Sequence, residues 1–146
     1  MKEVAHISSH RKLSMTRTLH RRLTALAFML AAILAGLLWR FAPLHLPFFL
    51  YKYGGSMLWS VALYFLIEAI LPRLSPMPLA VIAALAAAAV EFSRLLHTPA
   101  FDAFRLTLAG KLLLGRFFSL KNIAAYWLAI CLTAWIESSA KTEPHK

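Results

Sequence analysis

Residues 23–39 read LTALAFMLAAILAGLLW, a run of seventeen residues without a charge. Arg21 and Arg22 stand directly before the run, and Arg40 follows it. A membrane-spanning helix needs about 20 apolar residues, with a range of about 17–25. A cleaved signal peptide is the alternative, but no small-x-small cleavage motif follows, and Trp39 next to an arginine resembles an interface anchor. The run therefore predicts a retained membrane-spanning helix.

The composition of the whole chain also indicates a membrane protein. Of its 146 residues, 60% are hydrophobic and 15% are charged, whereas soluble domains are about 45–50% apolar. Sixteen Lys and Arg oppose six Asp and Glu. These cations flank or interrupt apolar runs, which is typical of contact with anionic lipid head groups and not of nucleic-acid binding. We expect the lipid bilayer to be the main partner.

Three further runs are long enough to cross a bilayer: 54–71, 78–96, and 123–136 extended to about 117–137. None of them shows the alternating pattern of a membrane β-barrel, so backbone hydrogen bonding requires helices. In the run 78–96, alanines recur at four-residue spacing, which favours close approach of another helix. The prediction is an all-α integral membrane protein, a four-helix transmembrane bundle with helices at about 23–39, 54–71, 78–96 and 117–137.

The remaining segments are expected to lie outside the membrane domain, which we place at 23–139. Residues 1–22 are polar and basic and predict a disordered tail, within which Met15 is a plausible alternative start. Residues 140–146 form a second tail. The motif LPRLSPMP at 71–78 is short and rich in proline, which predicts a tight hairpin.

The segment 98–116, before the last helix, is apolar yet basic. At about 100° per residue, Arg105 and Arg116 share a helix face, but the lysines between and after them do not. A continuous basic stripe is therefore excluded, and Gly110 and Gly115 weaken a helix further. We expect two short pieces broken at the glycines, either interfacial or re-entrant.

Two glutamates lie within the apolar runs, at different depths. Glu68 precedes the 71–78 hairpin and is expected to reach the nearby interface. Glu91 lies thirteen residues after Pro78, roughly 20 Å along a helix, and so belongs to the opposite half of the membrane. An ionisable residue inside the membrane suggests a functional site with a partner. For Glu91 we expect Arg94, three residues on, together with Arg105 or Arg116.

Catalytic signals are weak. The sequence has no glycine-rich phosphate loop, no nucleophile elbow and no cluster with metal-ligand spacing. Its one cysteine, Cys131, excludes an intramolecular disulfide. We therefore name no catalytic residue, no metal and no cofactor, and we leave open whether the chain is an enzyme, with the balance against it.

The stretches EFSRLL (91–96) and RLTLAGKLLLGRFFSLKNIAAY (105–126) resemble the signature of the domain-of-unknown-function family 2809, small bacterial inner-membrane proteins. KYGGSMLW (52–59) is similar to an upstream stretch of that family. The chain departs from the family pattern at three positions: Arg94 stands in place of Gln, Asn122 in place of Asp, and Ser56 where Asp is frequent. The resemblance implies a multi-pass inner-membrane protein without established activity, and it adds Tyr126 to the site. A more distant likeness links it to VanZ-like membrane proteins.

The first hypothesis is that a polar pocket near one interface binds an anionic lipid head group or another anionic ligand. The residues proposed to line it are Glu91, Arg94, Arg105, Arg116, Asn122 and Tyr126. The alternative is a small transporter or channel component, expected to be a homo-oligomer because four helices enclose little space, with a path from Glu91 to Glu68. An enzyme acting on a lipid-linked substrate and a purely structural scaffold are further alternatives. Cation counts on the two sides do not decide orientation, but the arginines before the first helix favour a cytoplasmic N-terminus.

Overall fold

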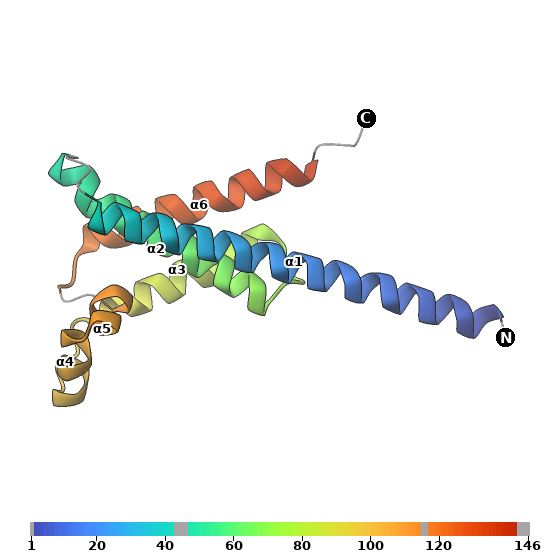
Figure 1. Cartoon of the computed structure of the whole chain (residues 1–146), viewed down its shortest axis with the longest axis horizontal. Helices are drawn as coiled ribbons and strands as arrows, with labels where there is room; N and C mark the ends of the chain where they lie inside the picture. Colours follow the sequence, from blue (N-terminus) through green and yellow to red (C-terminus); the bar gives the residue numbers. More distant parts are fainter. Residues whose placement is uncertain (1, 43–46, 115–116, 143–146) are drawn as a thin grey trace.

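The structure is a computed structural model that describes residues 2–42, 47–114 and 117–142. Within these residues the chain forms helices and no strand. In chain order the helices are α1 (Lys2–Phe41), α2 (Phe48–Ile70), α3 (Pro76–Ser93), α4 (Pro99–Leu106), α5 (Leu108–Leu113) and α6 (Leu120–Thr142) (Figure 1).

Four of these helices are long and apolar enough to cross a membrane, which confirms the predicted all-α fold. The qualifying stretches are Met15–Phe41, Phe49–Ile70, Pro76–Ser93 and Leu120–Ala140. Their outward side chains are large and apolar. Leu34, Leu85 and Trp135, for example, are each at least 60% exposed. Such a surface suits contact with lipid rather than water.

Helix α2 holds the bundle together, because it contacts α1, α3 and α6. Helix α3 packs on α6 through fully buried Ala83 and Ala87, whose small side chains allow the close approach expected for alanines at this spacing. The core around them is completed by Tyr64, Ile67, Leu79, Ala80, Tyr126, Ile130 and Ala134.

The connections define two ends of the bundle. At one end α1 stops, α2 begins, α3 stops and α6 begins, and α4 and α5 project to the side (Figure 1, left). We call this the Glu91 end. The opposite Glu68 end carries the hairpin between α2 and α3, whose residues, 71–75, lie within the expected turn at 71–78, because α3 already begins at Pro76. Both α1 and α6 extend past the hairpin on this side.

In place of the expected disordered tail, the basic N-terminal segment continues α1 back to Lys2. This part of the helix projects well beyond the other helices (Figure 1). No proline or glycine occurs between residues 2 and 35. A helix nucleated by the apolar span can therefore propagate backward, since propagation is much easier than nucleation.

The segment before α6 breaks into two short helices as expected, but the break lies at Thr107 and not at a glycine. The Thr107 hydroxyl donates to the Phe104 carbonyl at 2.7 Å and accepts from the Gly110 N–H at 3.0 Å, so it ends α4 and caps α5. Gly110 lies inside α5, where a Cβ atom would overlap the Phe104 carbonyl. Gly115 lies outside the described residues. The glycine at 110 thus permits close packing of the two helices.

Candidate functional site

The site is centred on Glu91, in the last turn of α3, whose side chain has no solvent exposure. Arg94, three residues on, places Nη1 at 2.6 Å from Oε2 and 2.7 Å from Oε1 of this carboxylate. The predicted intrahelical pair is therefore present. Its arginine is also nearly buried, with a 9% exposed side chain.

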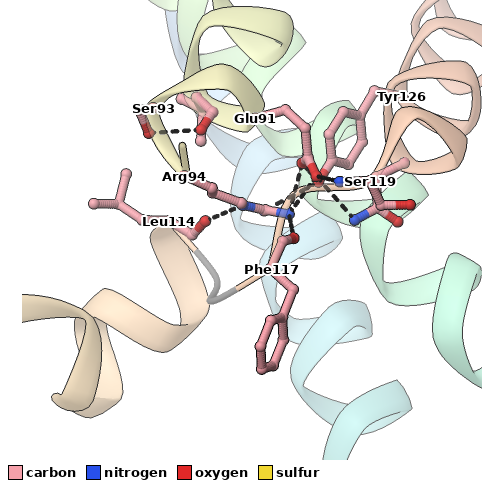
Figure 2. A network of polar contacts seen from close by, with 9 residues as sticks. Glu91, Ser93, Arg94, Leu114, Phe117, Ser119 and Tyr126 are labelled. Atoms are coloured by element: carbon pink, nitrogen blue, oxygen red, sulfur yellow. Dashed lines mark hydrogen bonds and ion pairs between the residues drawn. The ribbon is translucent and has the colours of Figure 1, made fainter. Parts of the chain in front are cut away.

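Two more elements donate hydrogen bonds to the same carboxylate. The Tyr126 hydroxyl, on α6, donates to Oε2 at 2.9 Å. Ser119, directly before α6, donates its backbone N–H to Oε1 at 2.8 Å, and the Asn122 amide reaches the same oxygen at 3.3 Å. Figure 2 shows Glu91 surrounded by these groups. A buried carboxylate needs this number of donors, because each missing one leaves charge unsolvated.

Arg94 binds two backbone carbonyls of the connection between α5 and α6. Its Nε donates to the Leu114 carbonyl and its Nη1 donates to the Phe117 carbonyl, the latter at 3.1 Å (Figure 2). Its Nη2 donates to the Tyr126 hydroxyl at 3.3 Å. We call the group of Glu91, Arg94, Ser119, Asn122 and Tyr126 the Glu91 clamp. The clamp ties the chain entering α6 to the end of α3.

Arg105 does not join the clamp, although we expected it or Arg116 to meet Glu91. It is 4% exposed and donates to the carbonyls of Ser93 and Leu96, at the end of α3. Its acidic partner is Asp102, at 3.2 Å. The last carbonyls of a helix lack partners within the helix and favour a nearby cation, which explains why α3 takes this arginine.

The structure thus brings four of the predicted site residues together, namely Glu91, Arg94, Asn122 and Tyr126. Arg105 instead binds the carbonyl of Ser93, the last residue of α3, and that of Leu96 just after it, and Arg116 lies outside the described residues. Two buried atoms of the described set have no hydrogen-bond partner, Nε of Arg105 and Oδ1 of Asn122.

A second polar cluster lies at the Glu68 end, and sequence reasoning missed most of it. Arg21 of α1 places Nε 2.6 Å from Glu68 of α2 and Nη2 3.1 Å from Glu137 of α6. The Tyr64 hydroxyl donates to Glu137 at 2.6 Å, and Arg21 also donates to the Pro72 carbonyl at 2.7 Å. Glu68 was expected to reach the interface, but it is 5% exposed and paired. The basic residues before the first span were the only available signal.

Between the clamp and this second cluster the helices pack through apolar side chains. Leu79, Ala83 and Ala87 of α3 face Ile130 and Ala134 of α6 in the buried core. The described residues contain no group of three His, Cys, Asp or Glu side chains placed to hold a metal ion. The described residues thus offer buried ion pairs and exposed cations.

Comparison with known proteins gives one match. The profile of the family described as "Protein of unknown function (DUF2809)" matches residues 45–130, more than half of the chain. The chain belongs to the DUF2809 family. The matched part of this DUF2809 protein contains the whole Glu91 clamp, whereas Arg21 and Glu137 of the second cluster lie outside it. No curated protein and no solved structure matches the chain.

Proposed function

We propose that this DUF2809 protein is a multi-pass protein of the bacterial inner membrane that binds anionic lipid head groups at its Glu91 end. The observation that carries the proposal is a set of exposed basic residues contributed there by four different helices. They are Arg40 at the end of α1, Lys52 in the first turns of α2, Lys111 in α5 and Lys121 at the start of α6.

Exposure distinguishes these residues from the buried arginines of the same end. Arg94 is paired with Glu91, and Arg105 with Asp102, so these pairs add little net charge. The exposed lysines and arginine then determine the surface potential around the clamp. Each basic residue near an anionic membrane surface contributes about 1 kcal/mol to binding.

The clamp supports this surface rather than contacting the ligand directly. Every nitrogen of the Arg94 guanidinium already donates to a carbonyl, a carboxylate or the Tyr126 hydroxyl. The clamp fixes the connection that begins after Lys111 and ends before Lys121. We infer that it holds these two lysines at a fixed spacing, which is how a rigid scaffold favours one ligand geometry.

The test is the lipid content of purified protein. In Lys111→Gln/Lys121→Gln, two lost charges correspond to about 2 kcal/mol, or roughly thirty-fold in affinity. We expect native mass spectrometry to show loss of bound phosphatidylglycerol and cardiolipin. Arg17→Gln/Arg73→Gln removes two exposed charges from the Glu68 end and is the matched control. Unchanged lipid content in the lysine variant, or equal loss in both variants, would contradict the proposal.

The alternative of a small oligomeric transporter or channel receives less support. Its predicted path links Glu91 to Glu68, but the described core between the two clusters is mainly alanine, leucine and isoleucine side chains. The buried Ser60 hydroxyl donates to the Met57 carbonyl of its own helix. Such packing offers no continuous series of groups to relay a proton or coordinate an ion within one copy of the chain. Binding of lipid needs no such path.

A further inference from the structure

Helix α4 buries a charged side chain and exposes apolar ones, the reverse of the distribution expected for a helix in contact with water. Its one buried side chain is a charged one, Arg105, at 4% exposure. Its largest apolar side chains face outward, with Phe101 at 41%, Phe104 at 40% and Leu106 at 62% exposure. In water, burial of the arginine and exposure of the phenylalanines would both be unfavourable.

Helix α5 repeats the pattern. Leu108 is 65% exposed and Leu113 is 55% exposed, whereas the buried position is Gly110. Within the described residues, α4 and α5 pack on each other, and α4 is joined to the end of α3 by the Arg105 guanidinium. The pair projects from the Glu91 end (Figure 1), and the exposed fractions of Phe104, Leu106 and Leu108 show that its apolar side chains are uncovered.

The position of this pair relative to the membrane follows from its neighbours. Helix α3 spans the membrane toward the Glu91 end, and α6 spans it back from the same end. The segment between them, 94–119, thus starts and finishes at one membrane boundary. Arg105 keeps it there, because its guanidinium is bound to the Ser93 and Leu96 carbonyls at the end of α3.

We propose that α4 and α5 form a wedge that lies within one leaflet, with Phe104, Leu106, Leu108 and Leu113 among the phospholipid acyl chains. The polar side of the wedge, Asp102 with its neighbour His97 at 3.5 Å, faces the head groups. Amphipathic helices at an interface insert their apolar face in this way, about 5–10 Å deep. The inference goes beyond the proposed function, because an uncharged bilayer can accept the same wedge.

Lipid suits this surface better than a second protein. At about 100° per residue, the exposed apolar residues of α4 cover an arc of about 220°, from Leu106 around to Phe101. A protein partner covers one side of a helix, whereas acyl chains surround any exposed side. The remaining arc of α4 is occupied by Arg105 and its ion-pair partner Asp102.

The test uses spin labels on single cysteines in a Cys131→Ala background, reconstituted in phosphatidylcholine vesicles. Labels at Phe104→Cys and Leu108→Cys report the wedge. Leu128→Cys, exposed on α6 within a span, is the lipid reference, and Asp102→Cys is the polar reference. We expect both wedge labels to collide severalfold more with oxygen and severalfold less with an aqueous nickel chelate than the Asp102→Cys label does.

Two outcomes would overturn the wedge. Nickel collision rates at both wedge sites equal to that at Asp102→Cys would place the helices in water. Protection from both reagents would show that a second copy or another protein covers them. Since the vesicles contain only zwitterionic lipid, failure of anionic lipid binding leaves this result unchanged. If one of the two wedge variants does not fold, the label at the other wedge site and a label at Leu113→Cys still provide the test.

Discussion

At the scale of single residues, Glu91 is the group whose burial needs the most compensation. Moving a carboxylate out of water costs several kcal/mol even after relaxation of the protein. Here the carboxylate receives the Arg94 guanidinium, a backbone N–H from Ser119, and the Tyr126 hydroxyl. Because these donors come from α3, from α6 and from the residue before α6, the same interactions that satisfy the charge also join the elements.

Glu91→Gln removes the charge but keeps the size of the side chain. It leaves Arg94 nearly buried without a counter-charge, and loss of one member of a buried pair costs about 3–5 kcal/mol. We expect this loss in the unfolding free energy measured in detergent micelles. Asp102→Asn is the comparison: the Asp102 carboxylate is 49% exposed, so solvent screens its pair, and Arg105 keeps the Ser93 and Leu96 carbonyls, so we expect a smaller loss than for Glu91→Gln. Equal losses in both variants would show that Glu91 is not the structural centre of the site.

Tyr126→Phe tests the hydroxyl alone. The hydroxyl donates to Glu91 and accepts from Arg94, so its removal should cost about 1–3 kcal/mol of unfolding free energy. Tyr51→Phe removes an exposed hydroxyl whose one described bond, to the Arg40 carbonyl, is 3.3 Å long. That change should stay within about 0.5 kcal/mol in the same assay. A phenylalanine at 126 without effect would mean that the other donors to Glu91 hold the clamp without the hydroxyl.

At the scale of helices, α1 packs along α2, and polar contacts add to this packing at two places. At the Glu68 end, Arg21 reaches both α2 and α6. At the Glu91 end, the Trp39 ring lies over Gly54 of α2, and its Nε1 donates to the Leu50 carbonyl at 3.2 Å. Along the rest of its apolar part α1 is mostly exposed, as a helix at the lipid boundary should be.

Gly54→Ala should weaken the second of these contacts. A Cβ atom at position 54 would lie 2.5 Å from the Trp39 ring, too close unless the ring or α1 shifts. Overpacking of this kind costs about 1–3 kcal/mol. Hydrogen–deuterium exchange should become faster in the second half of α1. Gly55→Ala is the adjacent control, because nothing lies within 4 Å of its Cβ position, and it should match the native protein or stabilise the helix by up to about 1 kcal/mol. The same exchange rates in both variants would contradict the assigned contact.

The sequence predicted the helices better than their contacts. Apolar runs of spanning length identified all four membrane helices, and the three-residue spacing of Glu91 and Arg94 identified their pair, because both signals are local. The partner of Arg105 was missed because backbone carbonyls at a helix end carry no side-chain signature. Arg21, Glu68 and Glu137 were not connected, because helix neighbours in space are not encoded by local spacing. Gly110 was predicted to break the helix, because its close packing against Phe104 cannot be recognised from the sequence.

At the scale of the whole molecule, the charges are divided evenly between the two ends. Counted by the end that each residue flanks in sequence, nine cations and four acids belong to the Glu68 end. Seven cations and two acids belong to the Glu91 end, so each end has a net charge of +5. The positive-inside rule counts cations near the spans, and a division this even leaves the orientation to the first helix.

We predict that both termini face the cytoplasm, because Arg17, Arg21 and Arg22 stand within about two turns before the first apolar run. A membrane-impermeant thiol reagent should then label Lys52→Cys in intact spheroplasts, and Arg73→Cys only after lysis, both in a Cys131→Ala background. The reverse pattern would invert the topology. Since the two ends are balanced, Arg17→Gln/Arg22→Gln should shift part of the population to the inverted orientation and make Arg73→Cys accessible from outside. A topology unaffected by this change would mean that the folded bundle, and not the charge on its first helix, sets the orientation.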